Sequence, residues 1–242
     1  EGAEARFDPR QLLPVANQVG EQPALELVVV DQLDVDRLEE LDAPGVLDVR
    51  PGTSVERINI NFSDPDTEVD GQRSHFGTPH PILSDDAVRM AIRLGIDRQK
   101  IADSFYFGGD LEPAVANILV GIPALESPNQ ELNYDPEGAK QILEDAGWTG
   151  DGTRSKDGVE LSVTYATSVN QVRQKTQAVV KDSLAQIGIQ VQLEQVDAGI
   201  FFDSAAGNDQ NIGHMYWDIN MYTNNATASV PIAYMQDWYA GE

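Results

Sequence analysis

Apolar residues recur every three or four positions in three parts of the chain, which predicts amphipathic helices. The first part begins at Ser84, the expected N-cap, and contains a second cap, Asp97, so two successive helices are expected. The second part is Asp135–Ala146, where a capping aspartate precedes a proline in the first helical position. The third begins at Asn170 and ends at Gly188, a residue type common just after helices.

Other stretches alternate between apolar and polar residues and predict strands. They are Val55–Phe62, Val159–Tyr165, Ile189–Val196 and Met215–Tyr222. Two of these strands flank the longest predicted helix, and this order is typical of a crossover between parallel strands. We therefore expect an α/β fold, or a mixed α+β fold, with a mixed sheet flanked by helices.

The first 50 residues are patterned more weakly. Leu25–Val30 reads as a short buried strand and Asp34–Leu41 as a short acidic helix. Farther on, Asp64–Pro81 reads as a long polar loop, and Ala198–Ala206 as one more helix.

Charge and composition narrow the class of partner. The 242 residues include 16 Lys and Arg against 40 Asp and Glu, a formal net charge of −24. Such a surface repels phosphate backbones, so no nucleic-acid partner is expected. The chain has no cysteine, which excludes disulfides and thiolate metal sites. No apolar run approaches the roughly 20 residues of a membrane helix.

Few residues suggest catalysis. His75 and His80 are five positions apart in the polar loop, and a zinc site there is weighed against ordinary loop histidines. Asp66 begins a run that resembles a calcium loop, but its twelfth position is Gly77 where the bidentate glutamate is needed, so an acidic turn is favoured. No nucleophile elbow, phosphate loop or dinucleotide fingerprint occurs.

One segment combines aromatic rings with amides and hydroxyls, the chemistry with which clefts hold small polar solutes. The alternative is an ordinary strand that places Trp217 or Tyr216 in the core. By alternation, Trp217 packs inside, while Tyr216 and Tyr222 share a polar face. The candidate residues of this segment are Tyr216, Trp217, Tyr222, Thr223, Asn224 and Asn225.

Three stretches together resemble a known family. They are Leu83–Ile101 (LSDDAVRMAIRLGIDRQKI), Tyr134–Trp148 (YDPEGAKQILEDAGW) and Val180–Val191, which ends QIGIQV. In order and spacing they are similar to the extracytoplasmic solute-binding proteins of peptide-type ABC importers, the oligopeptide, dipeptide and nickel-binding family. The resemblance covers about Gly52 to Tyr239.

The resemblance implies a periplasmic binding protein-like lobe. Members have two lobes that close on the ligand and are about twice this length. Residues 51–242 then correspond to the second lobe, and residues 1–50 match poorly. The chain looks like one lobe that carries half of a binding cleft.

The resemblance also implies site residues. Asn61 matches the end of a family strand near the cleft, and Tyr216–Asn225 matches the strand and loop that reach the ligand. Peptide binders often carry an aspartate just after that strand, whereas Asn225–Pro231 holds no acid. Recognition of a free peptide amino group is therefore not expected, and a sugar, a modified peptide or another polar solute stays open. The few arginines expected near the cleft argue against a strongly anionic ligand.

The functional expectation is solute binding for ABC transporter-mediated uptake, without enzyme activity, catalytic residues, metal or cofactor. The expected partners are a small polar solute and the membrane permease subunits of the importer. The protein is expected to be a monomer outside the cytoplasm, in the periplasm or on the outer face of the cell membrane. The alternatives are a metal- or acid-dependent hydrolase, and a surface sensing or adhesion protein that retains the lobe.

Overall fold

The computed structural model describes residues 53–106, 119, 122, 124–125, 134–226 and 230–236. The chain divides into two compact units, one of residues 1–50 and 108–111, the other of residues 51–107 and 112–242. All described residues belong to the second unit. The predicted strand Leu25–Val30 and helix Asp34–Leu41 lie outside the described residues.

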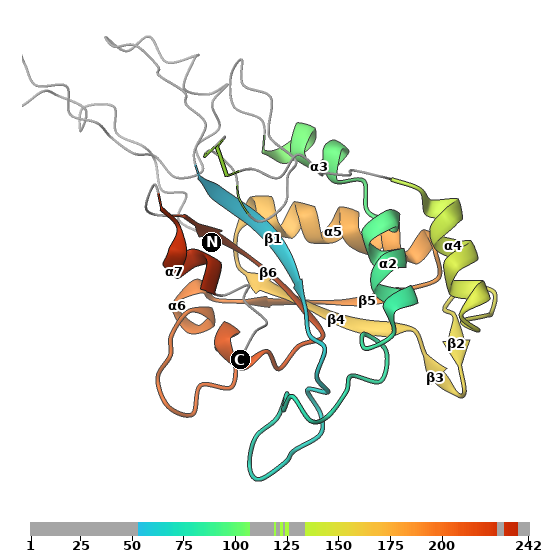
Figure 1. Cartoon of the computed structure of the whole chain (residues 1–242), viewed down its shortest axis with the longest axis horizontal. Coiled ribbons are helices and arrows are strands. Elements are labelled where there is room, and N and C mark those ends of the chain that lie inside the picture. Colours follow the sequence, from blue (N-terminus) through green and yellow to red (C-terminus); the bar gives the residue numbers. More distant parts are fainter. Residues whose placement is uncertain are drawn as a thin grey trace, which may run out of the picture. The chain divides into compact units, whose positions relative to one another are not determined.

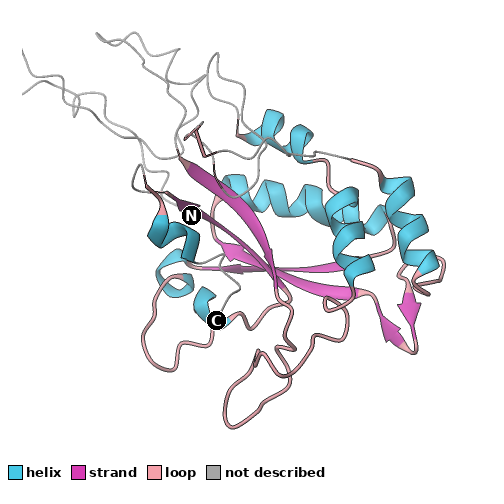
Figure 2. Cartoon of the chain, in the orientation of Figure 1, coloured by secondary structure: helices cyan, strands magenta, loops and turns pink. Residues whose placement is uncertain are grey.

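The second unit contains both strands and helices (Figures 1 and 2). Its main elements, in chain order, are β1 (Ser54–Ile60), α2 (Asp86–Gly95), α3 (Arg98–Phe105), α4 (Pro136–Asp145), β2 (Ser155–Lys156), β3 (Val159–Glu160), β4 (Ser162–Ser168), α5 (Gln171–Gln186), β5 (Gln190–Val196), α6 (Ala198–Phe201), β6 (Ile219–Asn225) and α7 (Ile232–Gln236). Every described helix is too short or too polar to cross a lipid bilayer.

Four strands form one mixed sheet in the order β1-β6-β4-β5. β4 is parallel to both β5 and β6, and β1 is antiparallel to β6 from the pair Ser54–Asn225 to the pair Ile60–Ile219. β2 and β3 form a separate short hairpin. The expected mixed sheet is therefore confirmed.

Helices α2, α4 and α5 cover one face of the sheet and form the main core with it (Figure 1). Ile58 of β1, Met221 of β6 and Tyr165 of β4 point into this core. Gly95 lets α2 approach α5 closely, because a Cβ at this position would lie 2.7 Å from Ile187 Cδ1. The predicted amphipathic helices thus bury their apolar stripes against one side of the sheet.

The opposite face carries a smaller cluster under α6. Ala166, Val196 and Phe201 are buried there, and Trp217 and Tyr222 pack against them. β6 is a central strand with both faces covered, so Ile219, Asn220 and Met221 are all buried. Alternation along β6 therefore separates two packed faces and not a core face from a solvent face.

The predicted caps are mostly correct. Asp97, Asp135 and Asn170 each accept a hydrogen bond from a backbone N–H of the helix that follows. The prediction of Ser84 as a cap is wrong, because Asp85 accepts from the backbone N–H of Ala87 instead. The hydroxyl of Ser84 donates to the carbonyl of His80 and so belongs to the preceding turn.

Asp85 also joins distant parts of the second unit. Its second carboxylate oxygen accepts from Trp148 Nε1 at 3.0 Å and from Lys156 Nζ at 3.2 Å. Partial burial raises the pKa of this carboxyl, but the hydrogen bonds from Trp148, Ala87 and Lys156 outweigh burial and lower the pKa below its ordinary value of 3.8. The cap of α2 is thus tied to the end of α4 and to β2.

Three elements differ from the sequence-based predictions by more than two residues or are divided in two. The last strand was expected over Met215–Tyr222 but runs Ile219–Asn225, because a short 3₁₀ turn at residues 212–214 and Met215 with φ +52° precede it. Leu161 separates β3 from β4 within the expected strand Val159–Tyr165. The expected helix Ala198–Ala206 is shorter and ends at Phe201.

Candidate functional site

The carboxyl ends of β4, β5 and β6 meet at one edge of the sheet, since these three strands are parallel. β4 lies between the other two. The connection from β4 to β5 contains α5 on the main-core face, and the connection from β5 to β6 contains α6 on the opposite face. Ligands of open α/β sheets bind outside the carboxyl ends where successive connections leave on opposite faces. Residues Tyr222–Asn225 lie at this edge.

Tyr222 is held by an arginine on the neighbouring strand. Arg57 lies opposite Tyr222 in the β1–β6 register and donates from Nη2 to the phenol oxygen at 2.8 Å. Its guanidinium carbon also lies 4.6 Å from the centroid of the Tyr222 ring. Asn59 Oδ1 accepts from Arg57 Nε at 3.1 Å, which orients the guanidinium. The half-buried ring therefore has a fixed position beside a cation.

Thr223 faces the other side of the sheet. Its hydroxyl accepts from Arg173 Nη2 at 2.9 Å and donates to Glu56. Arg173, on α5, also donates to both carboxylate oxygens of Glu56 and to Ser168 Oγ. This largely buried ion pair fastens β1, β4 and β6 to α5 next to the site.

Asn224 and Asn225 complete the carboxyl end. Asn224 shares the face of Tyr222, and its side-chain oxygen accepts from the backbone N–H of Asn225 at 2.8 Å. Asn225 is exposed and shares the face of Thr223. The four candidates thus belong to β6 itself and not to a loop after it, and strand alternation divides them between two faces.

Asn61 lies at the opposite end of β6. Its side-chain nitrogen donates to the carbonyl of Met215 at 2.7 Å and to Ser74 Oγ at 3.1 Å, and only 6% of the residue is exposed. Its backbone N–H donates to the carbonyl of Asp218. Tyr222 lies three residues beyond Ile219, the first residue of β6, and is therefore about 10 Å farther along the strand at 3.3 Å per residue. The structure therefore does not bring Asn61 together with Tyr222.

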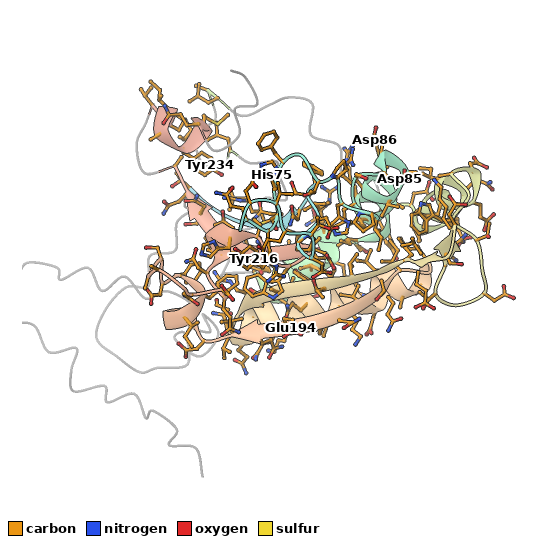
Figure 3. The ribbon with its side chains drawn as sticks, turned by 90° about the horizontal axis from the view of Figure 1, so that it is seen from below. His75, Asp85, Asp86, Glu194, Tyr216 and Tyr234 are labelled. Atoms are coloured by element: carbon orange, nitrogen blue, oxygen red, sulfur yellow. The ribbon has the colours of Figure 1, made fainter. Side chains whose placement is uncertain are left out.

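Tyr216 precedes β6 and also lies at this far end (Figure 3). The guanidinium carbon of Arg73 lies 4.3 Å from its ring centroid, and the ring of His214 stacks on it at 5.1 Å. Tyr216 and Tyr222 thus both have an arginine over the ring, Tyr216 before the start of β6 and Tyr222 at its middle. The expectation of few arginines near the candidate residues is wrong, so the argument against an anionic solute no longer holds.

Trp217 is partly buried, but on the face opposite to the one that alternation predicts. It precedes β6, and its ring lies 5.6 Å from the buried ring of Phe201. It belongs to the cluster under α6, whereas Ile219 and Met221 belong to the main core on the other face. Strand alternation could not predict this, because the chain turns between Met215 and Ile219.

The histidine metal site has no support in the geometry. His80 is buried, and its Nδ1 accepts from the backbone N–H groups of Ile82 and Leu83. Nδ1 therefore carries no proton, and the protonated Nε2 donates to Asp218 Oδ1 at 2.8 Å. Both nitrogens of His80 are occupied within the protein. Within the described residues, no three His, Cys, Asp or Glu side chains gather in a way that could hold a metal ion.

The acidic run near Asp66 forms a tight turn, as expected. Asp64 accepts from the backbone N–H of Asp66 and from the hydroxyl of Thr67 at 2.6 Å. The Thr67 hydrogen bond is the main cause that lowers the pKa of Asp64, against the raising effect of burial. Asp70 and Gly71 have positive φ between the bridged residues Val69 and Gln72.

Sequence reasoning missed Arg57, Asn59 and Phe202. Alternation along β1 places Arg57 and Asn59 on one face of the strand, but no local pattern identifies Tyr222 as their neighbour. Phe202 lies in the connection between β5 and β6, and its ring centroid is 6.5 Å from that of Tyr222. Only the pairing of distant strands reveals these contacts.

The curated relatives include oligopeptide-binding proteins and a nickel-binding periplasmic protein of Escherichia coli, the latter 29% identical over 139 residues and covering 54% of this chain and 26% of that protein. The chain is 29% identical over 210 residues to the oligopeptide-binding protein OppA of Mycobacterium tuberculosis, a match that covers 83% of this chain and 33% of that protein. It is 35% identical over 124 residues to the oligopeptide-binding protein AppA of Bacillus subtilis, covering 48% and 22%. The chain thus spans about a third of the length of OppA.

Solved structures share the fold at low sequence identity. An ABC transporter substrate-binding protein from Sinorhizobium meliloti has a TM-score of 0.54 at 23% identity, covering 76% of this chain and 32% of its own. An oligopeptide-binding protein from Thermus thermophilus, complexed with a pentapeptide, has a TM-score of 0.56 at 24% identity, covering 72% and 28%. A family model matches residues 24–241. The chain belongs to the bacterial extracellular solute-binding proteins, family 5, whose middle region this model describes.

Proposed function

We propose that this chain supplies one lobe of an extracytoplasmic receptor that binds peptides for uptake by an ABC importer. The observation that carries the proposal is the carboxyl end of β6, where Tyr222 and Asn224 share one face beside Arg57. Amides can donate to and accept from a peptide backbone, an aromatic ring stacks on a peptide plane, and a guanidinium pairs with a carboxylate. The relatives named as oligopeptide-binding proteins support a peptide over a sugar.

The mechanism is binding without bond cleavage. One lobe covers part of the solute, and the other lobe covers the rest when the two close. The solute shifts the equilibrium toward the closed state, because only that state encloses most of its surface. The closed receptor then delivers the solute to permease subunits in the membrane. We place this receptor in the periplasm or on the outer face of the cell membrane, as a monomer.

Thr223 and Asn225 lie within the proposed site and stay predicted solute contacts, whereas the predicted contacts Asn61, Tyr216 and Trp217 form the competing alternative. Two tyrosines offer a matched test, because each is half-buried and each carries an arginine on its ring. If the carboxyl end is the site, Tyr222→Ala in the complete gene product lowers peptide affinity tenfold or more, about 1.4 kcal/mol. Tyr216→Ala, at the far end of β6, leaves it unchanged.

Isothermal titration calorimetry with a pentapeptide mixture measures both variants, and thermal melts check that they fold. Equal losses in the two variants would mean that the solute reaches both ends of the strand. Unchanged affinity in Tyr222→Ala, with reduced stability, would make Tyr222 a structural residue and refute the proposed site. A wild-type protein that retains sugars and no peptides would refute the solute class.

A further inference from the structure

Two consecutive phenylalanines at the end of α6 lie in opposite environments. Phe201 is fully buried in the cluster under α6, whereas Phe202 is 47% exposed. Their ring centroids are 5.0 Å apart with the planes at 80°, so the buried ring supports the exposed one. Asp197 caps this short helix immediately after β5 by accepting from the backbone N–H of Gly199. Phe202 therefore projects from a fixed turn close to the carboxyl end of β5.

Phe202 reaches the proposed peptide site. Its ring centroid lies 6.5 Å from that of Tyr222, with the planes at 69°. Aromatic pairs range from about 4.5 to 7 Å, so this contact is at the loose end of the range and leaves ring surface uncovered. The guanidinium of Arg57 lies over the Tyr222 ring. Tyr222 thus has the guanidinium of Arg57 over its ring and the partly exposed ring of Phe202 beside it.

We infer that Phe202 is a specificity-determining residue that receives an apolar side chain of the bound peptide against its own ring and that of Tyr222. The inference rests on the proposed peptide-binding function. An isolated exposed phenylalanine is ordinary on a protein surface, but Phe202 adjoins polar groups suited to a peptide backbone. Burying the exposed ring surface of Phe202 against an aliphatic or aromatic group of the peptide lowers the free energy of the complex. Asn224, on the same face of β6 as Tyr222, then hydrogen-bonds to the backbone of the same peptide.

Phe62 is a matched control. It is 59% exposed, more than Phe202, and Arg89 lies over its ring with the guanidinium carbon 4.9 Å from the centroid. It follows the end of β1 that pairs with the start of β6, so it lies at the other end of the sheet. If only the loss of exposed aromatic surface mattered, substitutions of Phe202 and of Phe62 would change the retained peptides equally.

The experiment loads the complete gene product with a synthetic pentapeptide mixture and identifies the retained peptides by mass spectrometry. In the wild type, peptides that contain Leu, Ile, Val or Phe are enriched over the starting mixture. Phe202→Ser is expected to reduce that enrichment about tenfold while retaining polar peptides as before. Phe202→Leu keeps most of the enrichment, because it restores an apolar surface, and Phe62→Ser keeps all of it.

Three results would overturn the inference. Unchanged enrichment in a folded Phe202→Ser protein would refute the role of Phe202 while leaving the peptide-binding function intact. An equal loss of apolar and polar peptides would make Phe202 a structural support and not a specificity residue. Retention of no peptide by the wild type would refute the proposed function and this inference together.

Discussion

Gly188→Ala tests whether the fold requires a glycine at the left-handed position after α5. Gly188 ends α5 with φ +89°, and an added Cβ would lie 2.6 Å from Cγ and 2.9 Å from Cδ of Arg154. Arg154 is buried and donates from Nε to the carbonyl of Ile187 at 3.0 Å and from Nη1 to that of Trp148 at 2.9 Å. The new methyl group therefore strains the backbone and also displaces a buried arginine.

The expected loss of unfolding free energy is the sum of these two costs. The left-handed conformation costs a non-glycine residue roughly 1–2 kcal/mol, partly offset by about 0.4–1 kcal/mol from a less flexible unfolded chain. Displacing Arg154 leaves two buried carbonyls without their donors, at roughly 1–3 kcal/mol each. We expect Gly188→Ala to lower the free energy of unfolding by about 3–5 kcal/mol. Gly152→Ala, with φ +88° and nothing within 4 Å of the added Cβ, should lose only about 1 kcal/mol.

Urea unfolding followed by tryptophan fluorescence measures both free energies, with the m-value as a check that the transition stays comparable. A double variant, Arg154→Ala with Gly188→Ala, isolates the collision, because without the arginine the second substitution should cost no more than Gly152→Ala. If Gly188→Ala is as mild as Gly152→Ala in the presence of Arg154, the buried arginine tolerates displacement and the reasoning fails.

Three further predictions follow from the fold and the proposed function. Leu143→Ala on α4 removes a fully buried side chain and should cost about 2–5 kcal/mol in the same urea experiment, whereas a loss below about 0.5 kcal/mol would contradict its place in the core. Asp85 has a lowered pKa, so its charge stabilises the fold above pH 3.8 and this contribution disappears as the pH falls through the folded-state pKa. The stability advantage of the wild type over Asp85→Asn should therefore hold at neutral pH and shrink below about pH 4; an advantage that stays constant down to pH 2 would rule out the charge as its source. The 242-residue chain alone should bind the pentapeptide mixture weakly or not at all in calorimetry, because one lobe encloses only part of a solute, and a micromolar dissociation constant would count against the half-cleft proposal.

Local sequence was enough to locate the helices that begin with a recognisable capping residue and carry an apolar stripe. Asp135 and Asn170 are single capping residues before apolar stripes, and both helices begin where expected. At α2 two adjacent residues, Ser84 and Asp85, could cap, and local sequence could not choose between them. The structure uses Asp85, whose second oxygen is held by Trp148, a partner 63 positions away.

The tertiary structure alone decided which residues lie together at the candidate site. The candidate residues from Tyr216 to Asn225 are contiguous in sequence, but β6 separates their two ends by the length of a strand and turns alternate side chains to opposite faces. Arg57 meets Tyr222 across 165 positions, and Phe202 meets it through the connection after β5. Hydrophobic periodicity reports which residues are buried within one element, but strand order and register decide which elements become neighbours. The family resemblance was therefore readable from local motifs, whereas the cation and the second ring beside Tyr222 depend on long-range pairing.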